Sequence, residues 1–206
     1  MLKPILLAAA IHLAVIAGFA QSSSPQDNLP KNVVEQFCKI DAAGERLTPA
    51  GWHRADAFFV RPGPPAEDAT VSIMEGDFFV GTPQVNGDTA TVGVEYLELG
   101  HLDSSMRFVW ATSPYSPIKI RAFYTVVLTD RHWELGSDAS GPREVKGPVA
   151  WRIRDFQSES VVTVDTAIRY VTETRDKSTD PDLKRNADAT IAVLKKLKKM
   201  ALAPPA

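Results

Sequence analysis

The stretch NGDTATVGVEYLEL, residues 86–99, decides the fold class of this chain. Apolar side chains recur at every second position of it: Ala90, Val92, Val94 and Tyr96. This is the period of a β-strand with one buried face. The preceding Asn86-Gly87 pair tolerates positive φ angles and predicts a tight hairpin that joins about Asp77–Val85 to Thr89–Leu99. Leu97 and Leu99 have the opposite parity, which predicts a bulge near Tyr96-Leu97.

The same two-residue period extends over about residues 70–156 and predicts a curved antiparallel sheet. Further strands are predicted at three segments: Met106–Trp110, Ile118–Thr129 and Val149–Phe156. Short extended pieces at His132–Leu135 and Arg143–Lys146 flank a loop rich in Gly, Ser and Asp. They are typical of the open end of a long hairpin.

Helical periodicity is found on both sides of this region. We expect one helix from about Pro30 to Ala43, stopped at Gly44, and a second with Thr48 as its cap and Pro49 in its first turn. Two more apolar stripes follow the sheet and predict C-terminal helices, the second of which begins at Pro181 with Asp180 as its cap. The fold class is therefore α+β, with N-terminal helices packed on the sheet.

Residues 1–20 have the features of a secretory signal peptide. Lys3 precedes an apolar run that ends in small residues at Gly18 and Ala20. The alternative is an uncleaved membrane anchor, which Pro4 and His12 disfavour because they shorten and interrupt the run. We expect cleavage after Ala20, no membrane span in the mature chain, and a periplasmic or secreted protein.

Composition narrows the class of function. The net charge of -2 argues against generic nucleic-acid binding, and 44% hydrophobic residues suit a globular core. Cys38 is the single cysteine, so no intrachain disulfide forms. It shares a helical stripe with Val34 and Phe37, which favours a buried packing thiol over a reactive or dimer-linking one.

The order of elements resembles that of the nuclear transport factor two-like superfamily. The most specific pieces are LTPAGW at residues 47–52, which opens the second helix, and WRI at residues 151–153 in the last strand. The resemblance covers about residues 30–156. It implies an α+β cone with a pocket between helices and sheet, used for catalysis by ketosteroid isomerases and polyketide cyclases and for binding by other members. The isomerase pattern of a first-helix tyrosine and two inward acids is not found, because the first helix offers Phe37 instead.

The resulting domain hypothesis has five parts. After the signal peptide come a flexible leader at 21–29, a cone domain at 30–156, a helical extension at 157–200 and a disordered tail at 201–206. Aromatic residues of the cone domain are the candidate lining of a ligand pocket, with core packing as the alternative for each: Trp52, Phe59, Tyr96, Phe108, Tyr124 and Trp151.

Candidates for catalysis and metal binding are few. His53 and Asp56 are three residues apart on a predicted helix and could act as an oriented base, or form a surface hydrogen bond. His101 and Asp103 lie at a predicted turn centred on Gly100, after a strand, and could begin a metal site, although turn formation alone accounts for Asp103. No nucleotide-binding or hydrolase motif is present, so neither a metal nor a cofactor is predicted.

The sequence favours a non-catalytic module of the cell envelope that binds a small apolar ligand or an envelope protein. The alternatives are an isomerase- or cyclase-like enzyme using His53 or Asp56, and a structural protein whose last two helices bind a partner. A homodimer is implied by the resemblance. Its candidate contact is the sheet face bearing Phe123, Thr125 and Val127, which oppose the core-facing positions.

Overall fold

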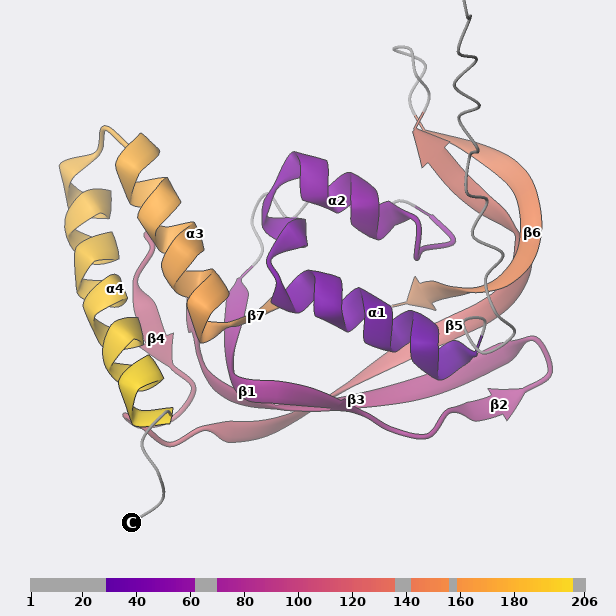
Figure 1. Ribbon diagram of the computed structural model, residues 1–206, viewed down its shortest axis with the longest axis horizontal. Coiled ribbons are helices and arrows are strands. Elements are labelled where there is room, and N and C mark those ends of the chain that lie inside the picture. The colour runs from indigo at the N-terminus through magenta and orange to yellow at the C-terminus, as the bar shows by residue number, and fades with distance from the viewer. Residues whose placement is uncertain (1–28, 62–69, 136–141, 156–158, 202–206) are drawn as a thin grey trace, which may run out of the picture.

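A computed structural model describes residues 29–61, 70–135, 142–155 and 159–201. These residues form an α+β structure in which four α-helices and one short 3-10 helix accompany a seven-stranded sheet (Figure 1). The signal peptide, most of the leader and residues 202–206 of the C-terminal tail predicted above lie outside the described residues, and Ala201 is the last residue of a helix. Among the helices of the described part, none is both long enough and apolar enough to cross a bilayer.

Two helices precede the sheet. Helix α1, Pro30–Ala42, has proline in its first turn, and Gly44 follows its end in the left-handed region at φ +80°. The 3-10 helix η1, Glu45–Leu47, leads to α2, Pro49–Asp56. The Thr48 side chain caps α2 by accepting a hydrogen bond from the Gly51 backbone N–H, as its position before Pro49 predicts.

The strands are β1 (Val71–Val80), β2 (Gln84–Asn86), β3 (Thr89–Leu102), β4 (Phe108–Trp110), β5 (Ile118–Leu135), β6 (Pro142–Asp155) and β7 (Ser160–Thr163). The main sheet order is β6-β5-β3-β1-β7, with β2 and β4 also paired to β3. The predicted hairpin is present, since Asn86 pairs with Thr89. The predicted strand 77–85, however, is divided, because β1 ends at Val80 and β2 begins at Gln84.

The sheet is antiparallel as predicted, except at the edge formed by β7. Strand β7 pairs with β1 in parallel, with Val71 opposite Ser160 and Met74 opposite Thr163. This strand has four residues, too few for a two-residue period to stand out before the helix that follows it. The sheet is therefore mixed, and the segment after Asp155 contributes one of its edges.

The predicted change of parity in β3 corresponds to register shifts between β1 and β3. One shift falls between Glu75 and Phe79 of β1, whose partners on β3 are the two neighbours of Tyr96. The other shift falls between Ile73 and Met74 of β1, opposite Leu99 of β3. The burial of these side chains gives the physical reason for the change of parity. Tyr96 is buried on the face that α1 covers, whereas Leu99 is buried on the opposite face, against the C-terminal helices.

Helices α3 (Val164–Lys177) and α4 (Pro181–Ala201) form a hairpin on this second face. Their buried residues form one cluster with sheet residues Val71, Ile73, Leu99 and Leu102. Figure 1 shows α1 and α2 within the curve of the sheet and the α3–α4 hairpin beyond β1 and β7. The end of the sheet that contains β1 and β7 is thus covered on both faces. Since each fully buried aliphatic side chain contributes roughly 1.5–3 kcal/mol, the C-terminal helices are an integral part of the core.

Candidate functional site

The space between α1 and the sheet, where the resemblance implies a pocket, is filled by side chains. Phe37 of α1 packs edge-on against Phe59 and Tyr124, with ring centroids 5.1 and 5.9 Å away. Beside them remains a cavity of about 10 Å³, lined by residues that include Cys38, Asp41 and Tyr124. This is the room of about one water molecule, so no substrate-sized space lies there.

A buried ion pair lies beside this cavity. Asp41 is 3% exposed and Arg46 is 4% exposed. An Arg46 Nη1 atom donates to Asp41 Oδ2 over 3.2 Å and to the Glu159 carbonyl oxygen over 3.2 Å, while the Val161 backbone N–H donates to the same carboxylate oxygen over 3.0 Å. The pair therefore fastens the end of α1 to β7.

Burial shifts the pKa values of the titratable groups around the cavity. Burial raises the pKa of Asp41 to about 6, although the nearby Arg46 guanidinium lowers it. Burial also raises the pKa of the Cys38 thiol to about 12 and that of the Tyr124 phenol above its usual range. Cys38 is buried and its thiol stays protonated, which confirms the packing role predicted from its helical stripe.

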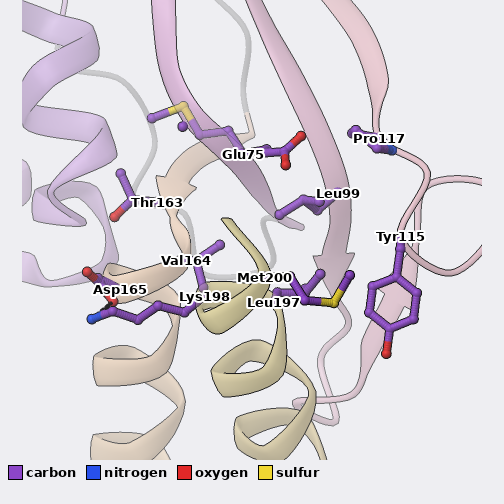
Figure 2. Close-up of a pocket in the computed structure, with 12 residues that line it drawn as sticks. Glu75, Leu99, Tyr115, Pro117, Thr163, Val164, Asp165, Leu197, Lys198 and Met200 are labelled. Atoms are coloured by element: carbon purple, nitrogen blue, oxygen red, sulfur yellow. Dashed lines mark ion pairs between the residues drawn. The ribbon is translucent and has the colours of Figure 1, made fainter. Parts of the chain in front are cut away.

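A pocket of about 440 Å³ opens on the other face of the sheet (Figure 2). It lies between β1 and β3, the loop that leads into β5, the first turn of α3 and the last turns of α4. Its apolar side chains come from strand and helices alike: Leu99, Val164, Leu197 and Met200. Met200 is 48% exposed, whereas Leu99 is 4% exposed, so the pocket extends from the solvent to the core.

The backbone of β1 gives this pocket its upper wall. Gly76 has φ +69°, and a Cβ built on it would meet nothing within 4 Å. It lies within the register shift between Glu75 and Phe79. A glycine at this bulge adopts the left-handed conformation without the cost that a side chain would add, and it leaves open space beside Glu75.

Polar groups lie around the apolar part of the pocket. The Lys198 amino group forms an ion pair with Asp165 over 2.7 Å, and Glu75 lies apart from that pair (Figure 2). Thr163 caps α3 by accepting a hydrogen bond from the Thr166 N–H. The combination of an apolar interior with a few polar groups at the edge is typical of sites for small molecules.

Tyr115 forms another wall of the pocket. It has φ +62°, an uncommon conformation for a residue with a side chain, and the residue is 40% exposed. Trp110 packs against the ring at a centroid distance of 5.1 Å, and the Lys196 amino group lies 4.9 Å from its centroid. These contacts hold the Tyr115 loop against the sheet and α4.

The six aromatic residues predicted to line a ligand site are placed mainly in the core. Trp52, Phe59, Tyr96 and Tyr124 are each 5% exposed or less, and Trp151 is partly buried against the same α1–α2 side. Phe108 is partly buried beneath α4. Tyr96 and Tyr124 line the 10 Å³ cavity, and none of the six lines the 440 Å³ pocket. Alternation along a strand identifies the buried face but does not say whether space remains above it.

The structure describes three of the four candidate catalytic and metal-ligating side chains. His101, predicted to lie at a turn centred on Gly100, is instead inside β3, which stays paired with β4 as far as Leu102. The His53 side chain lies outside what the structure describes, and Asp56 is partly buried at the end of α2. Asp103 accepts hydrogen bonds from the backbone N–H groups of Ser105 and Arg107, which is the turn chemistry offered as its alternative role. Within the described ranges, no three His, Cys, Asp or Glu residues are grouped so as to hold a metal ion.

The residues of the 440 Å³ pocket were missed by sequence reasoning because they come from five segments that are spread between Met74 and Met200. Leu197 is part of an apolar stripe that the sequence shows. The sequence does not show on which side of the sheet this face of the helix packs. The one local signal was Gly76 inside an otherwise strand-like segment, which is a recognised mark of a bulge.

Comparison with known proteins gives no relative. No family model, no curated protein and no solved structure matches this chain. The assignment of function therefore depends on the geometry described above.

Proposed function

We propose that this chain is an exported, non-catalytic binding module that holds a small, mostly apolar molecule in the pocket between the α3–α4 hairpin and the sheet. The observation that supports this proposal is the pocket itself, with about 440 Å³ of space and apolar side chains from three parts of the chain. Ligand sites of drug-sized molecules span about 300–1,000 Å³. Export to the periplasm or beyond is supported by the signal-like residues 1–20.

The alternative of an isomerase- or cyclase-like enzyme is less well supported. Such an enzyme would place a substrate and a proton-transferring group between α1 and the sheet, in line with the resemblance to the nuclear transport factor two-like superfamily. The 10 Å³ cavity beside Asp41 has no room for a substrate. The curve of the sheet around α1 and α2 favours the cone fold of that superfamily, and fold alone does not determine activity.

The alternative of a structural protein with a detachable helical appendage is also less well supported. Removal of α3 and α4 would expose Ile73 and Leu99, which are 0% and 4% exposed in the whole chain. We therefore expect the C-terminal helices to be needed for folding, and the pocket at their junction with the sheet to be a permanent feature.

The first experiment is native mass spectrometry of residues 21–206 purified from a secreting host. We expect a reproducible additional mass of a small molecule on the folded chain. Met200→Trp places an indole at the mouth of the pocket and should remove this mass. Ala192→Trp is the matched control, because Ala192 is exposed on the same helix and does not line the pocket.

Loss of the added mass in both variants would contradict binding at this pocket, as would its retention in Met200→Trp. A chain that carries no small molecule from the host, and binds none from a panel of apolar compounds, would overturn the proposed function.

A further inference from the structure

The pocket is lined by more negatively charged than positively charged side chains. Glu75 and Asp165 contribute two carboxylates to its lining, and Lys198 contributes one amino group. Asp165 and Lys198 neutralise each other across 2.7 Å. The nearby Lys196 amino group lies against the Tyr115 ring. One negative charge, that of Glu75, is left uncompensated among the described lining residues.

Glu75 is well placed to meet a bound molecule. It lies on β1 next to Gly76, where the backbone leaves open space, and its side chain is partly buried. In the described part of the chain, no hydrogen bond or ion pair involves its carboxylate. Figure 2 shows this carboxylate above Leu99, away from Asp165 and Lys198. A partner for it can therefore come from a molecule in the pocket.

We infer that the ligand of this pocket is an amphipathic amine, whose apolar chain packs against Leu99, Leu197 and Met200 and whose ammonium group pairs with Glu75. This inference rests on the proposed function, because it names the chemical class of molecule for the same pocket. A carboxylate ligand of the same length would meet repulsion from Glu75. A neutral ligand would gain the apolar contacts alone.

The preference for the amine should be modest and sensitive to salt. Glu75 is partly exposed, and ion pairs at such positions are weakened by solvent and by dissolved ions. We expect the amine to bind about five- to tenfold more tightly than the neutral analogue at low ionic strength, and the ratio to fall as salt is added.

Three probes of equal chain length test this inference by isothermal titration calorimetry: n-octylamine, n-octanol and n-octanoate. The expected order of affinity for the wild-type chain is amine, then alcohol, then carboxylate. Glu75→Gln should bring the amine to the affinity of the alcohol while leaving the alcohol unchanged. Asp77→Asn is the matched control, since it removes the same charge from the same strand without touching the pocket, and it should keep the preference for the amine.

The outcomes separate this inference from the proposed function. If the three probes bind equally, or if Glu75→Gln keeps the preference, the amine is not the ligand class while the apolar pocket remains. If the carboxylate binds best, the inference is also overturned. If Met200→Trp leaves the binding of all three probes unchanged, the pocket is not the site and both proposals fail.

Discussion

At the scale of single residues, the buried ion pair of Asp41 and Arg46 links the end of α1 to β7 through further hydrogen bonds. Both side chains are almost completely buried, and the carboxylate also accepts the Val161 N–H of β7. The pKa of Asp41 is nevertheless raised to about 6, because the loss of solvation exceeds the attraction of Arg46. The ionised carboxylate is thus less favourable in the folded chain than in the unfolded one.

Because the pKa of Asp41 is raised, the free energy of unfolding depends on pH. Asp41 stabilises the fold most below its ordinary pKa of 3.8, and this contribution is lost as the pH rises to about 6. At about 1.4 kcal/mol per pKa unit, the loss is on the order of 3 kcal/mol. Asp41→Asn removes the titration, so the free energy of unfolding of the wild type should fall relative to that of the variant between pH 4 and pH 7.

Urea unfolding at several pH values measures this difference. Asp88→Asn, at the exposed turn between β2 and β3, is the control for removal of a surface carboxylate. A wild type that gains stability relative to Asp41→Asn as the pH rises would show that the ion pair outweighs its desolvation, contrary to this prediction.

At the scale of elements, side-chain hydrogen bonds join helix α4 to the start of β4 and to the turn before it. Thr190 is 3% exposed, accepts a hydrogen bond from the Phe108 N–H over 2.9 Å and donates one to the Met106 carbonyl over 2.8 Å. Asn186 adds a bond from its side-chain amide to the Ser105 carbonyl over 3.2 Å. These contacts hold α4 at the position that forms one side of the pocket.

Thr190→Val should therefore lower the free energy of unfolding by about 1–3 kcal/mol, because it keeps the shape of the side chain but leaves two backbone groups without this partner. Urea denaturation is the measurement. Thr172→Val is a matched control on α3, where the hydroxyl bonds only to the Ile168 carbonyl of its own helix. Equal effects of the two changes, to within about 0.5 kcal/mol, would contradict an anchoring role for Thr190.

At the scale of the whole molecule, the part of the outer sheet face that α3 and α4 do not cover carries large apolar side chains. Phe79 is 65% exposed and Phe123 is 61% exposed, and a hollow of about 240 Å³ next to them is lined by Gly81 and Gly93. Glu95 on the same face is paired with Lys119 and Arg121. A patch with both protruding rings and a hollow, and with both signs of charge, suits pairing with its own copy about a two-fold axis.

We accordingly expect the chain to form a homodimer through this face, with Phe123 at the contact. Thr125 and Val127, the other residues predicted there, are partly buried and should contribute less. Phe123→Glu should yield a monomer by light scattering, because two carboxylates would face each other across the axis. Val149→Glu is the control, since Val149 is 61% exposed on β6. A wild-type monomer at high concentration, or a dimeric Phe123→Glu variant, would rule this contact out.

Several turns and helix ends could be predicted from residues that are close together in the sequence. Asn86-Gly87 predicted a hairpin because few residues adopt the required turn, Thr48 before Pro49 predicted a helix start, and Asp180 before Pro181 predicted another. In the structure the Asp180 carboxylate accepts the backbone N–H of Asp182 over 2.8 Å. Such features depend on residues a few positions apart, so the sequence determines them without knowledge of the rest of the chain.

Only the tertiary structure decided the parallel pairing of β7 with β1, the face on which α3 and α4 pack, and the pocket between them. Sequence periodicity showed that Leu99 and Leu197 are apolar positions of a strand and a helix. It could not show that both pack against the same cluster, or that Glu75 and Lys198 line one pocket across 123 positions of sequence. Such contacts depend on how whole elements pack, since a period identifies a buried side of an element and not its neighbour.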